Sequence, residues 1–182
     1  MPPSYDLFFA SSNIHKFKEA KKILEGFKIN LGFFKCELEE LQSNSLLEIA
    51  KDKSIKAFKK CKKPVIVEDD GLFIDSLNGF PGPYSSYVFK TIGNVGILNL
   101  LKQKRKAKFI SIISFYDKKN SISFESKLSG TISKKIIGEG WGFDPIFIPS
   151  QLKKTFAQIK NKNEISHRFK ALKKFSNWYL DM

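Results

Sequence analysis

The chain has 182 residues, of which 42% are hydrophobic and 14% aromatic, and its net charge is +14. This length and composition exclude an intrinsically disordered chain and are typical of one globular domain, which we predict to span residues 1–182. No run reaches the roughly 20 apolar residues that cross a bilayer, and the N-terminal sequence lacks a signal segment, so we expect a soluble cytoplasmic protein with no membrane partner.

The positive charge comes almost entirely from lysine, because Arg105 and Arg168 are the only arginines among 32 basic residues. Arginine is preferred for bidentate contacts with bases and phosphates, whereas lysine often serves as a solvated surface charge. The charge is therefore compatible with a lysine-rich genome, with an anionic small substrate or with nucleic acid. Cys36 and Cys61 lack CxxC spacing, which favours reduced thiols over a metal site or a disulfide.

Hydrophobic periodicity predicts strands that alternate with helices. In chain order we expect a strand at 5–10, a helix through 17–27, a strand at 29–34, a helix at 45–62, a strand starting at 65–67, a turn-rich loop at 78–83, a helix at 94–104, a hairpin of strands 109–116 and 121–128, a loop and strand at 138–149, and a helix at 165–179. This alternation, with one hairpin, indicates an α/β protein with a mixed sheet.

Small polar residues precede the first predicted helix. Ser11, Ser12 and Asn13 supply N-cap chemistry, and Lys16 follows one turn inside the helix. The N–H groups and dipole at the start of a helix attract anions. The segment therefore predicts either a phosphate site or an ordinary capped helix.

Three adjacent carboxylates, those of Glu68, Asp69 and Asp70, follow the buried strand that starts at Val65. Acidic side chains at the end of a strand suit Mg²⁺, which takes oxygen ligands and shares them with substrate phosphates. The alternative is a solvated turn whose charges face water.

Two further segments combine aromatic, acidic and basic residues. Trp141 and Phe143 stand among glycines and are followed by Asp144, so the loop can stack on a base and accept from a ring N–H, or pack at a strand edge. His167 and Arg168 are adjacent at the start of the last predicted helix, where they form either a recognition pair or a polar helix start.

Taken together, these segments resemble the signature set of the inosine triphosphate pyrophosphatase family. The T/S-x-N-x-x-K-x-x-E element is matched by Ser11, Asn13, Lys16 and Glu19. The family's E/D-D-S-G-L and N/G-G-x-P-G-x-Y-S elements read EDDGL (68–72) and NGFPGPYSS (78–86). Its later blocks read GWGFDPIF (140–147), TFAQI (155–159) and KNEISHRFKAL (162–172), in the family's order over nearly the whole chain.

The resemblance implies a fold, an activity and a set of site residues. The fold is a long mixed β-sheet flanked by helices, with two lobes around a central nucleotide cleft, usually in a homodimer. The activity is hydrolysis of non-standard purine nucleoside triphosphates (ITP, dITP, XTP) to the monophosphate and pyrophosphate, with Mg²⁺ as cofactor. Asp69 and Glu68 would be catalytic, and both would bind the metal together with Glu48. The substrate would be bound by Ser11, Ser12, Asn13, Lys16, Lys53, Asp70, Trp141, Gly142, Phe143, Asp144, Lys162, His167 and Arg168, with His167 and Arg168 reading the 6-oxo group of the base.

The chain departs from the family pattern at two acidic positions. Asp70 stands where the family has serine, and the family's acidic residue near the metal falls on Asn44 or Ser45, with Glu40 and Glu48 as nearby substitutes. Two alternatives stay open. One is a basic module that binds single-stranded nucleic acid, and the other is a catalytically weakened nucleotide-binding member of the family. The primary hypothesis is the pyrophosphatase, for which we expect no specific nucleic-acid partner.

Overall fold

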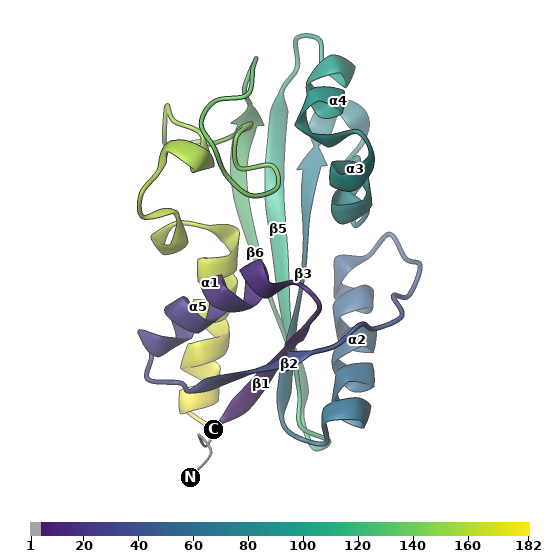
Figure 1. Ribbon diagram of the computed structural model, residues 1–182, viewed down its shortest axis with the longest axis vertical. Helices are drawn as coiled ribbons and strands as arrows, with labels where there is room; N and C mark the ends of the chain where they lie inside the picture. Colours follow the sequence, from purple (N-terminus) through teal and green to yellow (C-terminus); the bar gives the residue numbers. More distant parts are fainter. Residues whose placement is uncertain (1–4) are drawn as a thin grey trace. The chain divides into compact units, whose positions relative to one another are not determined.

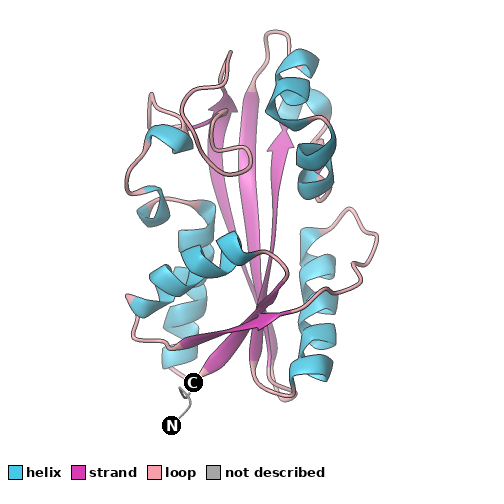
Figure 2. Cartoon of the chain, viewed as in Figure 1, coloured by secondary structure: helices cyan, strands magenta, loops and turns pink. Residues whose placement is uncertain are grey.

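The computed structural model describes residues 5–182, which form one mixed sheet of seven strands and five α-helices (Figures 1 and 2). The strands are β1 (Leu7–Ser11), β2 (Leu31–Lys35), β3 (Val65–Ile74), β4 (Pro81–Gly82), β5 (Lys106–Tyr116), β6 (Ser121–Ile132) and β7 (Phe147–Pro149). The helices are α1 (Ile14–Glu25), α2 (Leu46–Cys61), α3 (Ser85–Thr91), α4 (Gly93–Leu100) and α5 (His167–Leu180).

The sheet has the strand order β2-β1-β3-β5-β6-β7, with β4 paired to β3. Strand β1 pairs in parallel with β2 and β3, whereas β3–β4 and β6–β7 are antiparallel. The predicted mixed sheet of an α/β protein is confirmed. Among residues 5–182, no helix combines the length and the apolar character needed to cross a membrane. The first four residues, part of the stretch searched for a signal segment, lie outside the described residues.

The chain divides into two compact units. The first contains the described residues up to Asp69 together with 111–126 and 168–182, and the second contains 70–110 and 127–167. Strands β3, β5 and β6 contribute residues to both units. This division agrees with the two lobes that the resemblance implies.

In the first unit, helices cover both faces of the strands (Figure 1). Side chains alternate along β5: Ile113 and Phe115 belong to the apolar cluster that includes α1 and α5, whereas Ser114 bonds to Ser54 of α2 at 3.2 Å. Because successive side chains of a strand point to opposite faces, α1 and α5 pack on one face and α2 on the other.

The second unit has its own apolar core. This core contains side chains from the C-terminal end of β3, the N-terminal end of β5, α3, α4 and the segment around β7. The Phe109 ring lies 4.6 Å from that of Phe147 and 6.2 Å from that of Phe156. These three packed rings anchor the segment from 133 to 166, in which β7 is the one strand, because each ring buries a large apolar area.

Two predicted elements were wrong in extent. The strand predicted to start at 65–67 was expected to carry the acidic residues at its C-terminal end, but it continues to Ile74, so these residues lie inside the strand. Gly71 permits this because its backbone approaches β4 closely: a Cβ there would lie 2.4 Å from the carbonyl oxygen of Gly82. The helix predicted at 94–104 is α4, which begins at Gly93, ends at Leu100 and follows the unpredicted α3.

Candidate active site

Strand geometry separates the three adjacent acids. In β3 the side chains of Glu68 and Asp70 belong to one face and that of Asp69 to the other, because side chains alternate along a strand. All three carboxylates are largely buried, so each needs a compensating charge. Each one meets a different basic side chain.

Glu68 is the most deeply buried of the three. Its Oε2 accepts from Arg168 Nε at 2.7 Å and its Oε1 from the Ser111 hydroxyl at 2.9 Å. Arg168, 2% exposed, also donates through Nη1 to Glu19 of α1. Arg168 was predicted to contact the base, and in the structure its Nε and Nη1 donate to two carboxylates of the first unit.

Asp69 points toward α2. Lys53 of that helix places its Nζ 3.7 Å from Asp69 Oδ2 and 2.9 Å from Glu40 Oε1. Two carboxylates therefore approach one ammonium group. Glu48, the predicted third metal ligand, is exposed and accepts from the Ser43 hydroxyl at 2.7 Å. Of the two substitutes considered from sequence, Glu40 is the one beside Lys53.

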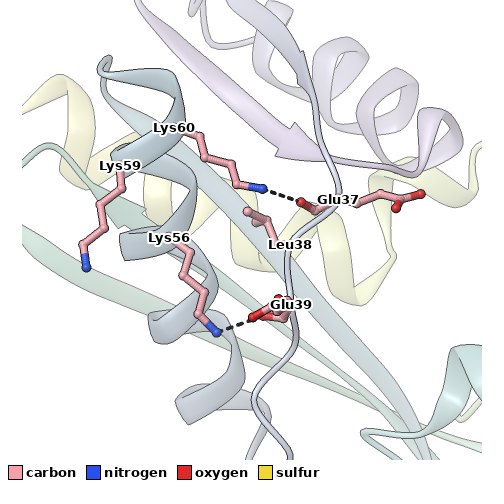
Figure 3. A pocket seen from close by; sticks show the side chains of 6 residues that line it. All are labelled: Glu37, Leu38, Glu39, Lys56, Lys59 and Lys60. Atoms are coloured by element: carbon pink, nitrogen blue, oxygen red, sulfur yellow. Dashed lines mark hydrogen bonds between the residues drawn. The ribbon is translucent and has the colours of Figure 1, made fainter.

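The segment that carries Glu40 is fastened to α2 across a pocket of about 610 Å³ (Figure 3). Lys60 Nζ donates to the Glu37 carbonyl oxygen at 2.9 Å and Lys56 Nζ to that of Glu39 at 3.0 Å. The predicted site residues do not line this pocket. These two bonds hold the backbone at Glu37 and Glu39, next to Glu40, against α2.

The predicted phosphate segment forms a well-capped start of α1. Asn13 Oδ1 accepts from the backbone N–H groups of His15 at 2.9 Å and Lys16 at 3.4 Å, and Ser11 Oγ accepts from Asn13 N–H at 3.0 Å. Asn13 thus satisfies two N–H groups that the helix itself leaves without an intrahelical partner. The binding of an anion by Ser11, Ser12, Asn13 and Lys16 stays a prediction.

In the second unit, His167 is buried against aromatic rings. Its ring stacks on Phe109 with centroids 4.4 Å apart and an interplanar angle of 10°. Its Nε2 lies 3.6 Å from Asp70 Oδ2. His167 belongs to this unit and Arg168 to the other, so the two residues predicted to act as a pair have different surroundings.

The glycine-rich loop supplies an ion pair and a core aromatic. Lys162 Nζ lies 2.7 Å from Asp144 Oδ2 and 5.9 Å from the centre of the Phe156 ring. Phe143 is only 5% exposed and packs edge-on against Phe89, so the structure places it in the core. Of the two aromatic residues predicted to contact a base, Trp141 is the less buried.

Sequence reasoning did not identify Asn94, at the start of α4. Its Nδ2 donates to the Gly142 carbonyl oxygen at 3.1 Å, whereas its Oδ1 is buried and has no hydrogen-bond partner among residues 5–182. The signal in the sequence was its place at the beginning of the helix predicted at 94–104, which is too general to assign a role.

The acidic residues do not form a ready-made metal site. Within the described part of the chain, no three Asp, Glu, His or Cys side chains gather closely enough to hold an ion by themselves. Mg²⁺ often uses only one or two carboxylates together with substrate phosphates. Asp69 and Glu40, which both approach the Lys53 ammonium, are enough carboxylates for a site of that kind.

Comparison with known proteins places the chain. A model of the Ham1 family matches residues 7–178. The chain belongs to the Ham1 family. A dITP/XTP pyrophosphatase from Methanopyrus kandleri is 47% identical over 179 residues, covering 95% of each chain, and one from Pyrococcus horikoshii is 44% identical over 178 residues, covering 94% of this chain and 95% of the relative.

Solved structures of Ham1 proteins share the fold. A HAM1 protein from Coxiella burnetii, 26% identical, superposes with a TM-score of 0.86, covering 98% of this chain and 100% of its own. The Staphylococcus aureus Ham1 protein, 29% identical, gives 0.80 with 96% and 98% coverage. This Ham1 protein therefore has relatives that match it along nearly their whole length.

Proposed function

We propose that this protein hydrolyses non-standard purine nucleoside triphosphates, those of inosine and xanthosine, to the monophosphate and pyrophosphate. The observation that carries the proposal is the buried Asp69, a carboxylate beside the Lys53 ammonium. Near full-length relatives named dITP/XTP pyrophosphatase support it.

In the proposed reaction a water oxygen bonds to the α-phosphorus while the bond from that phosphorus to the bridging oxygen breaks, so that pyrophosphate leaves. The proton of the water passes to the carboxylate of Asp69. The Lys16 and Lys53 ammonium groups stabilise the charge that gathers on the pyrophosphate. Glu68, held by Arg168 and Ser111, fixes the strand that presents Asp69.

We also propose Mg²⁺ as the cofactor, held by Asp69 and, from its position beside Lys53, Glu40. When bound, Mg²⁺ would neutralise phosphate charge and make a coordinated water more acidic. Glu68 and Glu48 remain predicted ligands. For either to bind the ion, its carboxylate would have to exchange or share a hydrogen bond, to Arg168 or to Ser43.

Base selection in this proposal rests on hydrogen-bond donors. A ring N–H of His167 aimed at the 6-oxo group has an acceptor in hypoxanthine and xanthine, whereas adenine presents an amino group there. A buried donor left without an acceptor can reject a substrate by orders of magnitude. Lys162 and Asp144, which form an ion pair at 2.7 Å, would also border the base.

The test incubates the purified protein with ITP, XTP, GTP and ATP, with Mg²⁺ or with EDTA, and measures pyrophosphate. We expect ITP and XTP to be hydrolysed at least about 100-fold faster than ATP, and no pyrophosphate with EDTA. Asp69→Asn should lower kcat by about 10²- to 10⁴-fold, while Asp75→Asn, which alters an exposed carboxylate just beyond β3, should not. Equal rates with ATP would refute the substrate class.

The same assay separates the alternatives. A single-strand-binding module would bind oligonucleotides in a strongly salt-dependent manner and release no pyrophosphate. A weakened family member would gain thermal stability from ITP without turning it over. Neither alternative is supported by the names of the relatives.

We further propose that the enzyme acts in the cytoplasm. Fractionation of cells should recover it in the cytoplasmic fraction.

We propose a homodimer as the working assembly. Helices α3 and α4 expose large apolar side chains: Tyr87 is 69% exposed, Val95 59% and Leu100 50%. Exposed apolar patches mark contact surfaces. Sedimentation velocity should show a dimer that Val95→Glu converts to a monomer and that Lys90→Glu, on an exposed position of α3, leaves intact. A wild-type monomer would overturn this proposal.

A further inference from the structure

His167 is a buried imidazole with unmet hydrogen-bonding capacity. It is 6% exposed, and neither Nδ1 nor Nε2 has a hydrogen-bond partner among residues 5–182. Stacking on Phe109 covers one face of the ring and leaves both ring nitrogens without a partner among the described residues. A buried polar atom without a partner costs about 1–3 kcal/mol. Two such atoms on one ring point to a place where a ligand or an ordered water completes the site.

Asp70 lies against one edge of that ring. Its Oδ2 is 3.6 Å from Nε2, longer than a hydrogen bond but close enough for an ion pair, and its side chain is 13% exposed. An ionised carboxylate accepts hydrogen bonds and donates none, so it favours a ring nitrogen that carries a hydrogen over one that presents a lone pair. A serine, which the family pattern has at this position, can donate or accept and imposes no such choice.

We propose that Asp70 is a positioning residue for His167: as the carboxylate that faces Nε2, it orients the ring and compensates the charge of an imidazole with hydrogens on both nitrogens, so that Nδ1 donates its hydrogen to the 6-oxo group of the purine base. The inference rests on the proposed function, and it gives the third acid of β3 a role separate from the metal and the triphosphate.

The surroundings of His167 favour a base over a phosphate as the ligand. The ring lies 6.3 Å from Phe156, which in turn lies under the Lys162 ammonium paired with Asp144. Aromatic faces and one carboxylate–ammonium pair suit a flat heterocycle with N–H and C=O groups on its edge. A triphosphate would place its negative charge against Asp70.

Binding of two partial ligands separates the base from the phosphates. Inosine monophosphate carries the base without a triphosphate, and inorganic tripolyphosphate carries the phosphates without a base. By calorimetry with Mg²⁺, Asp70→Ala should weaken binding of inosine monophosphate about 10-fold, as expected for a lost charge-assisted interaction. Binding of tripolyphosphate should stay equal or tighten. Unchanged binding of inosine monophosphate with tighter binding of tripolyphosphate would assign Asp70 to the phosphate side and overturn the proposal.

A double-mutant cycle tests whether Asp70 acts through His167. His167→Phe keeps a ring that can stack on Phe109 and removes both nitrogens. In that background Asp70→Ala should change the affinity for inosine monophosphate less than about twofold, because the residue it positions is gone. An equal loss in both backgrounds would refute the positioning role. Asp75→Ala is the matched control, and Asp70→Ser replaces Asp70→Ala if the latter does not fold.

A spectroscopic readout needs no catalysis. The chain has two histidines, so ¹⁵N-histidine labelling gives signals from His167 and from the exposed His15, which serves as internal reference. Asp70→Ala should change the Nε2 signal of His167 and leave those of His15 unaltered, and inosine monophosphate should shift Nδ1 of His167. Identical His167 signals with and without Asp70 would overturn the pairing. A protein that fails to hydrolyse ITP but shows these shifts would refute the proposed function and support the positioning.

Discussion

The ion cluster around Arg168 permits a sharp test of what holds the first unit together. Arg168→Met keeps much of the side chain's length and removes its charge. The change deletes the 2.7 Å bond from Nε to Glu68 and the bond from Nη1 to Glu19. The Glu68 side chain is fully buried and keeps the hydrogen bond from Ser111, whereas that of Glu19 is 21% exposed and can regain water.

The magnitude follows from the charge left behind. Removing one partner of a buried pair costs about 3–5 kcal/mol, because the remaining charge is uncompensated. Glu19 adds little, since partial exposure screens its charge. For a chain of this size the loss corresponds to a fall in Tm of roughly 6–20 °C. Glu68→Gln in the same chain removes the orphaned charge and should restore most of the lost stability.

The assay is urea unfolding followed by tryptophan fluorescence. A Trp141→Phe background leaves Trp178, which packs on the core of the first unit, as the reporter. Arg105→Met is the matched control, because among residues 5–182 that guanidinium donates only to backbone carbonyl oxygens, of Ser133 at 2.7 Å and Leu101 at 3.1 Å. It should cost about 1–2 kcal/mol. If Arg168→Met costs no more than this control, or if Glu68→Gln gives no recovery, the reasoning fails.

Three further outcomes are expected. Gly71→Ala should destabilise the protein by about 1–3 kcal/mol or more in urea titrations, because the added methyl group would lie 2.4 Å from the Gly82 carbonyl oxygen. Unchanged stability would mean that β3 and β4 can move apart to make room for the methyl group. Burial raises the pKa of both thiols, Cys36 and Cys61. Iodoacetamide should therefore modify them more slowly at pH 7 than it modifies a free cysteine, and the rate should rise with pH. Rapid labelling at neutral pH would contradict this expectation. Lys53→Met should raise the KM for ITP about 10-fold or more through the lost ammonium–phosphate contact, and an unaltered KM would remove Lys53 from the substrate site.

Much of the fold follows from local pattern. Residues 45–62 were predicted as a helix and form α2 at Leu46–Cys61, because an apolar stripe, a serine N-cap and a proline beyond the end all agree. The hairpin of β5 and β6 follows from two β-rich runs around a four-residue turn in which Asp117 accepts from two backbone N–H groups. Strand β3 was underestimated, because charged residues rarely continue a buried strand unless distant partners compensate them.

The sequence by itself determined which residues we predict to carry the chemistry: the acids of β3, the lysines, the capped start of α1 and the His167–Arg168 pair stand out by type and spacing. Only the tertiary structure decided which of them meet. Glu68 and Arg168 are 100 residues apart, and nothing local distinguishes that pairing from one with Asp69 or Asp70. The alternation of β3 sends adjacent acids to opposite faces, and the helices packed there supply Arg168 to one face and Lys53 to the other. The partner of each buried charge is therefore set by packing between distant segments, which local sequence does not encode.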